Sequence, residues 1–133
     1  MELARLTATW SKDPSTQVGA VIADNKCVVS TGFNGFPPGI ADFDYRYACR
    51  DIKYDLVLHA EMNAIFNAHR SVDGMTLYST LFPCVRCAMY IIRAGIKRIV
   101  CYHSESRHNI DELTIAELLA EAGVEIEVTY SKE

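Results

Sequence analysis

The sequence has 133 residues, of which 50% are hydrophobic and 23% are charged, and its formal net charge is −4. This length suits a single domain, residues 1–133, with enough chain to bury a hydrophobic core. The negative balance gives no general attraction to nucleic-acid phosphates, and no apolar run approaches the roughly 20 residues that a membrane-spanning helix needs. We therefore expect neither a nucleic acid nor a membrane as partner. The cysteines without a secretion signal indicate reduced thiols and a cytoplasmic protein of bacterial, viral or host origin.

The N-terminal part of the chain predicts a helix, a hairpin and two loops. Apolar side chains at helical spacing indicate the helix, which Asp13 and Pro14 end. The turn signal Asp24-Asn25 joins two strands so tightly that they must be antiparallel neighbours. The expected order is a helix over 3–10, strands over 17–23 and 27–33, a shaped loop rich in glycine and proline over 32–39, and a long, partly ordered connection over 40–56.

The rest of the chain predicts strands that alternate with helices. Pro83 in the first turn and Gly95 at the end frame one helix, and Asn109 with Glu112 has the spacing of a capping box for another. The expected order is a helix from His59 to about His69, a strand over 75–80, a helix over 83–94, a strand over 97–102, a helix through Ala122 and a strand over 125–130. We therefore expect an α/β fold with three layers, α/β/α, in which helices cover both faces of a five-stranded mixed sheet.

His59, Cys84 and Cys87 have the spacing of a metal site with three protein ligands. One histidine and a Cys-x-x-Cys pair leave the fourth position of a tetrahedral zinc ion open, which is typical of a catalytic site. Both ligand groups lie at predicted helix starts, where the positive end of the helix dipole favours thiolates. Glu61 follows His59 by two residues, and in a first helical turn both side chains can reach an ion beyond the helix end.

Zinc and Glu61 together suit the replacement of an aromatic amino group by oxygen. Zinc lowers the pKa of bound water from 15.7 toward about 7, which provides a nucleophile at neutral pH. Glu61 could take a proton from that water and pass it to the ring nitrogen and the leaving amine. The combination of His-x-Glu with Pro-Cys-x-x-Cys is the signature of zinc-dependent nucleobase deaminases.

With these residues in view, the chain resembles the cytidine-deaminase-like superfamily and, within it, the deoxycytidylate (dCMP) deaminases. The likeness spans nearly the whole length, and the motifs in this order and spacing are specific. They lie at 11–20 (SKDPSTQVGA), 32–37 (GFNGFP), 59–65 (HAEMNAI), 81–84 (LFPC) with Cys87, and 94–97 (AGIK).

The resemblance implies a hydrolase that converts dCMP to dUMP and ammonia in pyrimidine nucleotide metabolism and feeds dTTP biosynthesis. It implies zinc held by His59, Cys84 and Cys87, with Glu61 as the proton shuttle. It also implies an allosteric homo-hexamer, activated by dCTP and inhibited by dTTP, each with Mg²⁺. The residues that the resemblance places near the regulatory nucleotide are Gly32, Phe33, Asn34 and Gly35.

The resemblance and the residues around the motifs give candidates for substrate contact. Asn34 is expected near the sugar and Ala60 beside the substrate, while Ser11 and Lys12 could hold the phosphate or end a helix. Relatives often read Ser-Asp-Lys-Tyr-His after the fourth strand, whereas Arg107 stands here in place of the tyrosine, before His108. Arg107 could stack on the base, pair with a phosphate, or lie on the surface. His108 is a further candidate for substrate contact.

Other functions stay open from the sequence. The substrate could be another cytosine nucleotide, such as dCTP or a modified dCMP. A deaminase of tRNA or another polynucleotide shares the zinc motifs but calls for a basic face. A structural zinc module would have no use for Glu61. A second zinc ion could be held by Cys49 together with His103 or His108.

Overall fold

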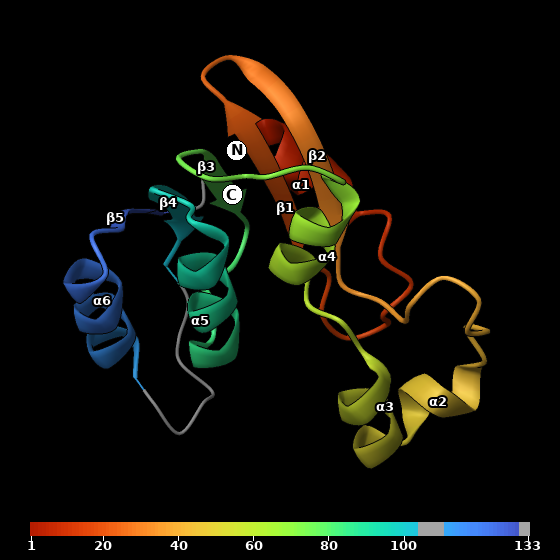
Figure 1. Cartoon of the computed structure of the whole chain (residues 1–133). Coiled ribbons are helices and arrows are strands. Elements are labelled where there is room, and N and C mark those ends of the chain that lie inside the picture. The colour runs from red at the N-terminus through yellow and green to blue at the C-terminus, as the bar shows by residue number, and fades with distance from the viewer. Residues whose placement is uncertain (104–110, 131–133) are drawn as a thin grey trace.

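The computed structural model describes residues 1–103 and 111–130. Within these ranges a helix and a β-hairpin are followed by three consecutive helices, after which strands alternate with helices (Figure 1). In chain order the elements are α1 (Glu2–Ala8), β1 (Gly19–Asp24), β2 (Cys27–Phe33), α2 (Asp44–Ala48), α3 (Arg50–Leu56), α4 (Ala60–Asn67), β3 (Thr76–Ser79), α5 (Val85–Ala94), β4 (Arg98–Tyr102), α6 (Glu112–Glu121) and β5 (Glu125–Thr129). None of the described helices is both long and apolar enough to cross a membrane.

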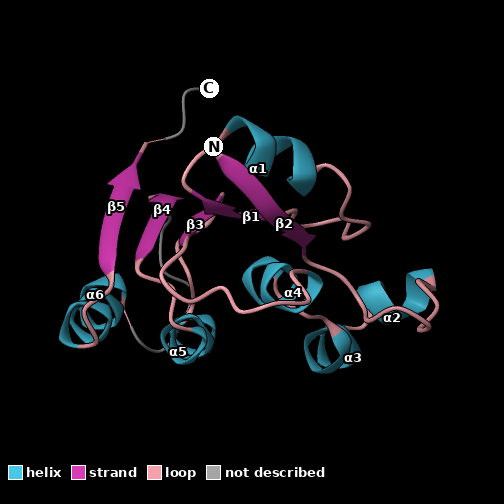
Figure 2. Cartoon of the chain, turned by 45° about the horizontal axis from the view of Figure 1, so that its top comes forward, coloured by secondary structure: helices cyan, strands magenta, loops and turns pink. Residues whose placement is uncertain are grey.

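The strands form one mixed sheet in the order β2-β1-β3-β4-β5. Strand β1 pairs antiparallel with both β2 and β3, whereas β3–β4 and β4–β5 are parallel pairs. Figure 2 shows α1 on one face of the sheet and α4, α5 and α6 on the other, so the sheet is the middle of three layers. The predicted α/β fold with a five-stranded mixed sheet is therefore confirmed.

The ends of the helices differ from their predicted positions. His59 and Cys84 are the N-caps of α4 and α5, each with extended backbone, rather than members of the helices. The predicted capping box of the last helix is wrong because Asp111 is the N-cap of α6, and its Oδ1 accepts a hydrogen bond from the Thr114 N–H at 2.8 Å. Asn109 lies outside the described residues.

The connection over 40–56 contains two short helices, α2 and α3, which the sequence did not indicate. Neither has a side chain that caps its N-terminus, and their residues lack a clear apolar period, so the usual signals of a helix are missing. They lie beside the main layers rather than on the sheet (Figure 1). Tyr47 of α2 anchors them by stacking on Phe36, with ring centroids 4.4 Å apart.

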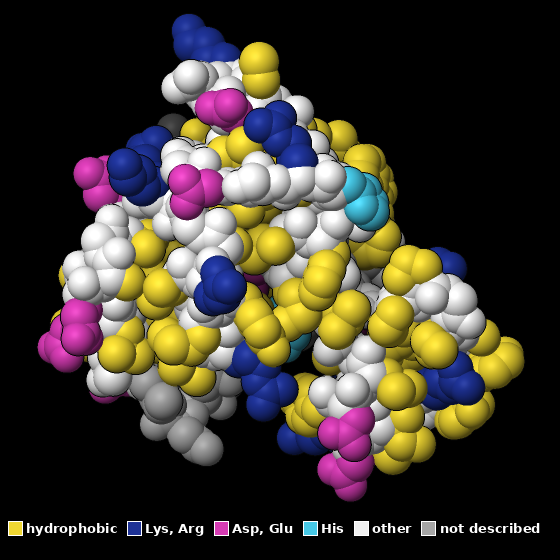
Figure 3. Space-filling model, viewed as in Figure 1, with side chains coloured by type: hydrophobic (Ala, Val, Ile, Leu, Met, Phe, Trp, Pro, Cys, Tyr) yellow, Lys and Arg dark blue, Asp and Glu magenta, His cyan; other side chains and the backbone are white. Residues whose placement is uncertain are grey.

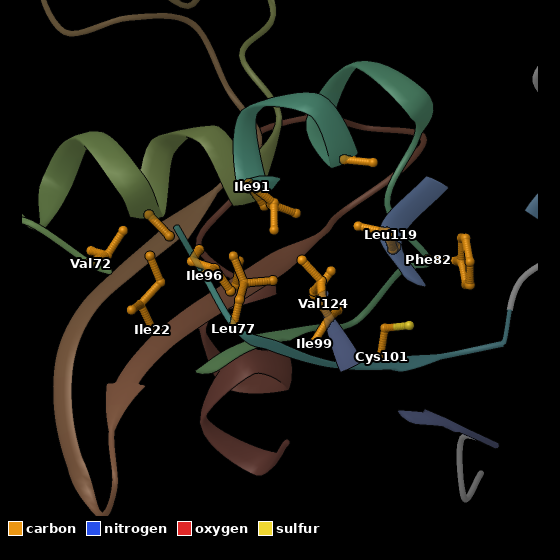
Figure 4. Packing of buried hydrophobic residues seen from close by; sticks show 14 of the residues in the cluster. Ile22, Val72, Leu77, Phe82, Ile91, Ile96, Ile99, Cys101, Leu119 and Val124 are labelled. Carbon is orange, nitrogen blue, oxygen red and sulfur yellow. The ribbon is translucent and has the colours of Figure 1, made fainter. Parts of the chain in front are cut away.

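The core lies between the sheet and the layer of α4, α5 and α6. Ile22, Leu77 and Ile99 come from three neighbouring strands and are fully buried. Ile91 of α5 and Leu119 of α6 pack in the same cluster (Figure 4). Burial of each such side chain contributes roughly 1.5–3 kcal/mol. This core fixes α5 and α6 on the sheet and thereby fixes the start of α5, which carries two of the candidate metal ligands.

Gly32 lets the backbone of α4 lie directly against β2. A Cβ at this position would lie 2.3 Å from the Ala64 nitrogen and 2.5 Å from the Ala60 carbonyl oxygen. Across the same contact, the Ser30 hydroxyl donates to the Ala64 carbonyl oxygen at 2.7 Å. The position of α4, and of His59 at its start, therefore depends on the absence of a side chain at Gly32.

We expect Gly32→Ala to lower the free energy of unfolding by about 3 kcal/mol. The added methyl group would overlap backbone atoms of α4, which cannot move away by a change of rotamer. Urea denaturation followed by circular dichroism measures the change. Gly35→Ala is the matched control, since a Cβ there would have Phe33 Cε2, at 4.0 Å, as its nearest contact. Equal stabilities of the two variants would contradict the packing argument.

Candidate metal centre and active site

The three predicted metal ligands converge on one point. The His59 Nδ1 and the Sγ atoms of Cys84 and Cys87 all lie within 4.8 Å of one another. The Nδ1 atom is 3.4 Å from the Cys84 Sγ and 3.3 Å from the Cys87 Sγ. Among the described residues this is the one group of three or more side chains with metal-ligand atoms so close together.

The fold brings these ligands together at the N-terminal ends of two neighbouring helices. His59 caps α4, and Cys84 caps α5 through its Sγ, which accepts a hydrogen bond from the Cys87 N–H at 3.5 Å. Helices α4 and α5 lie side by side on the same face of the sheet (Figure 2). The positive ends of both helix dipoles therefore meet at the ligands, where they favour thiolate over thiol.

The two cysteines titrate as a coupled pair. The neighbouring Cys87 side chain and the His59 ring lower the pKa of Cys84 to about 3. The Cys84 sulfur, together with burial, raises the pKa of Cys87. The contact with Cys84 also raises the pKa of His59, against the effect of burial. The pair therefore shares a proton that a bound cation would displace, because a coordinating thiol is deprotonated outright.

These residues fit a zinc ion. Two sulfur atoms and one imidazole nitrogen are the donors that zinc prefers, and three protein ligands leave one tetrahedral position for a reactant. The soft donor set disfavours Mg²⁺ and Ca²⁺, which prefer oxygen ligands.

Glu61 lies in the first turn of α4, close to the ligands and almost completely buried, with 4% of its surface exposed. Its Oε1 accepts a hydrogen bond from the Ser79 hydroxyl at 3.0 Å. Burial raises the pKa of Glu61, although Cys87, His59 and Ser79 oppose the shift. A carboxyl group with a raised pKa beside a metal site can carry a proton at neutral pH.

A cavity of about 1200 Å³ opens in front of these residues. The surface is hollowed between the α5 side of the molecule and the arm formed by α2 and α3 (Figure 3). Its lining combines two of the metal ligands, His59 and Cys84, and Glu61 with polar, cationic and apolar side chains. The full lining is Asp13, Ser15, Thr16, Gln17, Val18, Asn34, Tyr47, Ala48, Arg50, Lys53, Tyr54, Val57, His59, Ala60, Glu61, Leu81, Phe82, Pro83, Cys84, Glu112 and Ile115.

Some of the other predicted substrate residues line the cavity and some do not. Asn34 and Ala60 line the cavity. Ser11 is buried and its hydroxyl donates to the Asn34 carbonyl oxygen at 2.7 Å, while the largely exposed Lys12 pairs with Asp42 at 3.1 Å. Neither Ser11 nor Lys12 is part of the cavity lining. Arg107 and His108 lie outside the described residues.

The amide of Asn34 holds the cavity wall in place. Its Oδ1 accepts a hydrogen bond from the Val18 N–H at 2.8 Å, and its Nδ2 donates to the Thr16 carbonyl oxygen at 2.8 Å. Nδ2 also lies 3.4 Å from the Asp13 carboxylate. Asn34 therefore fixes residues 13–18 against the end of β2.

The residues predicted to lie near a regulatory nucleotide do not gather at one described site. Gly32 packs against α4, and Phe33 makes an edge-on contact with Trp10 at 6.5 Å. Gly35 forms backbone hydrogen bonds with Leu58 in both directions. Within the described part of the chain, Asn34 is the member of this set that lines the large cavity.

The proposed second zinc site is not assembled in the described residues. Cys49 is exposed, and His103 pairs with Glu112, with 3.4 Å between Nδ1 and Oε2. Neither Cys49 nor His103 belongs to a group of three metal-ligating side chains there. His108, the other candidate, lies outside the described residues.

No local pattern of the sequence predicts the ion pair that joins α3 to the loop after α1. Lys53 Nζ is 2.8 Å from Asp13 Oδ2, and it also donates to the Ser15 hydroxyl at 2.8 Å. Burial alone would raise the pKa of Asp13, but hydrogen bonds from Lys53 and from the Ser15 and Thr16 backbone hold that pKa below its ordinary value. The partners are 40 residues apart, so local patterns could not reveal them.

Comparisons with known proteins point to one family. The family model described as the cytidine and deoxycytidylate deaminase zinc-binding region matches residues 1–103. The deoxycytidylate deaminase of Homo sapiens is 45% identical over 127 residues, which cover 90% of this chain and 70% of that protein. An uncharacterized deaminase of Aliivibrio fischeri is 43% identical over 132 residues, which cover 94% of this chain and 87% of that protein.

A solved structure agrees with these relatives. The dCMP deaminase from the cyanophage S-TIM5, in complex with dCMP and dUMP, aligns with a TM-score of 0.77 and 29% sequence identity. The alignment covers 96% of this chain and 92% of that one.

We expect the purified protein to bind about one zinc ion per chain, measured by inductively coupled plasma mass spectrometry after dialysis. Cys84→Ser and Cys87→Ser each remove a ligand and should lose the ion, whereas Cys49→Ser should keep it because Cys49 is exposed and outside the ligand group. Retention of zinc by both ligand variants would contradict the assignment.

Lys53→Met should lower the free energy of unfolding by about 3 kcal/mol at pH 7, because it leaves the buried Asp13 carboxylate without its cation. The folded-state pKa of Asp13 is below its ordinary value of 3.8, so this stabilisation is present above pH 3.8 and is lost as the pH falls through the folded-state pKa. The difference from the unmodified protein should therefore shrink in acid. Lys12→Met is the control, since its pair is exposed and worth at most about 1 kcal/mol.

Proposed function

The chain belongs to the family of cytidine and deoxycytidylate deaminases, which are zinc-dependent hydrolases, and we propose that its substrate is dCMP, converted to dUMP and ammonia. The observation that carries this proposal is the convergence of His59, Cys84 and Cys87 beside the buried Glu61. His59, Cys84 and Glu61 also line the large cavity. The human relative is named deoxycytidylate deaminase, and the cyanophage relative was solved with dCMP and dUMP. These names favour dCMP over other cytosine nucleotides.

The chemistry divides between the metal site and Glu61. His59, Cys84 and Cys87 would hold the zinc, which when bound supplies the Lewis acidity that brings the pKa of water toward about 7. Glu61 accepts a proton as water adds to the carbon that bears the amino group, and it delivers this proton to the ring nitrogen. It then takes the proton of the new hydroxyl group and delivers it to the leaving amine, as the C–N bond breaks and the C=O bond forms. One water is consumed and one ammonia is released for each dCMP.

The cavity offers a cationic wall for the phosphate. Arg50 of α3 lines it together with the hydroxyl-bearing Ser15 and Thr16. Lys53 lies beside them, with its charge balanced by Asp13. Because Ser11 and Lys12 are not part of the lining, we assign the phosphate to the α3 wall instead. Asn34, which we place at the sugar side, contributes by fixing residues 13–18. Ala60 forms part of the floor beside His59.

The finer proposal is an allosteric homo-hexamer that dCTP activates and dTTP inhibits, each with Mg²⁺. It rests on the likeness of residues 32–37 to the family's glycine-rich loop. Exposed apolar side chains at Leu6, Trp10 and Phe66 offer surface for contacts between subunits. Arg107 is a proposed substrate contact because it stands where relatives often have a tyrosine near the pyrimidine. His108 is another because it follows the end of the fourth predicted strand on the presumed substrate side.

The zinc-loaded protein should release ammonia from dCMP faster than from CMP, dCTP or deoxycytidine, measured with a coupled glutamate dehydrogenase assay. Deoxycytidine differs from dCMP by the phosphate alone, so their ratio reports the cationic wall. Glu61→Gln should keep its zinc and lose at least about 100-fold in kcat.

Each comparison in this assay has a contrary outcome. Full turnover by Glu61→Gln would remove the proposed proton carrier. If none of the four substrates releases ammonia while zinc is bound and the protein is folded, the nucleotide proposal is contradicted. Polynucleotides would then be the substrates to test. Addition of dCTP or dTTP with Mg²⁺ tests the regulation separately, since an unresponsive but active enzyme loses only the allostery.

A further inference from the structure

Ser79 places a hydroxyl group beneath Glu61, inside the core. It is the last residue of β3 and is completely buried. Its Oγ is 3.0 Å from Glu61 Oε1 and donates a hydrogen bond to that oxygen. Burial of a hydroxyl group costs free energy unless the group is hydrogen-bonded. The bond to Glu61 offsets this cost for Ser79.

The strand register shows what surrounds Ser79. Its partner on β1 is Ala20 and its partner on β4 is Cys101, and residues paired in register project to the same face of a sheet. Both neighbours are small and fully buried. The small side chains of Ala20, Ser79 and Cys101 leave room for the Glu61 side chain above them. Ser79 is the one of the three that offers Glu61 a hydroxyl group.

The Ser79 hydroxyl group makes two hydrogen bonds, one as acceptor and one as donor. The Leu81 N–H donates to Ser79 Oγ at 3.3 Å, so the hydroxyl oxygen is already used as an acceptor. Its single proton is left for Glu61 Oε1. Ser79 thereby links Glu61 to the segment that leads from β3 to Cys84.

We propose that Ser79 is a positioning residue, which holds Oε1 of Glu61 so that Oε2 is the oxygen presented to the cavity for proton transfer. This inference rests on the proposed deaminase function, in which Glu61 moves protons at the substrate. Without the hydroxyl bond the carboxylate can rotate, and either oxygen can turn away from the reacting atoms. Ser79 contacts no reactant itself, so its effect passes through Glu61.

A matched pair of variants tests the inference. Ser79→Thr keeps the hydroxyl and Ser79→Val removes it, while both add about the same volume to the buried position. We expect kcat for dCMP to be roughly 10- to 100-fold lower in Ser79→Val than in Ser79→Thr. KM and zinc content should match between the two. Equal kcat values, or loss of zinc from Ser79→Val alone, would overturn the proposal.

A spectroscopic measurement is independent of turnover. In protein labelled with ¹³C at the glutamate carboxyl carbon, the Glu61 signal is identified by its absence from Glu61→Gln. Its chemical shift should move in Ser79→Val and stay in place in Ser79→Thr, because only threonine can donate to Oε1. An unmoved signal in Ser79→Val would overturn the positioning role whatever the substrate proves to be.

Two further comparisons keep the outcomes separate. If neither β-branched variant folds, Ser79→Ala is compared with the unmodified protein by the same kcat and ¹³C criteria, since it adds no volume. If the unmodified protein does not deaminate dCMP, the proposed substrate fails, and the ¹³C shift still decides whether Ser79 holds Glu61.

Discussion

The direct contact between the α4 backbone and β2 is the constraint on which the site depends. Gly32 removes the side chain that would separate them, and β2 is an edge strand whose carbonyl groups need partners. The helix supplies these partners, because Asn63 donates to the Phe33 carbonyl oxygen at 2.8 Å and Asn67 to that of Thr31 at 2.9 Å. The contact therefore fixes the distance of α4 from the sheet and its rotation about its own axis. The positions of His59 and Glu61 at the start of α4 are fixed with it.

The sheet topology then brings the remaining groups to the same edge. Strand β3 ends at Ser79 and leads to the start of α5, where Cys84 lies. Because β1 runs antiparallel to β2 and β3, its beginning next to Val18 lies at the edge where β2 leads to Asn34. Ligand sites at the carboxyl ends of parallel strands follow from such geometry, since helix N-termini collect there. Segments far apart in the sequence thus line one cavity.

The sequence predicted those features that local patterns encode. Strand β2 coincides with its predicted range, and the spacing of His59, Cys84 and Cys87 predicted the ligand group that the fold assembles. Spacing encodes such a group because helix starts fix the direction of each ligand. Helices α2 and α3 were missed because they lack caps and an apolar period.

Contacts between residues far apart in the chain could not be predicted from local sequence patterns. Lys53 joins Asp13 across 40 residues, and nothing local distinguishes it from an exposed lysine. Ser11 and Lys12 lie in a motif that resembles the family, but a motif does not reveal which side chains point inward, and Ser11 is buried against Asn34. Ser79 reads as an ordinary strand residue until the register places it below Glu61.

Two almost completely buried carboxyl groups line the cavity, and their surroundings give them opposite properties. Burial tends to raise the pKa of both Asp13 and Glu61. For Asp13, the Lys53 ammonium group and backbone N–H donors overcome burial and lower the pKa, so it stays ionised and holds the wall. For Glu61, the opposing contacts are insufficient and the pKa stays raised. These surroundings keep Asp13 ionised, whereas the raised pKa of Glu61 suits the proton transfer that we propose for it.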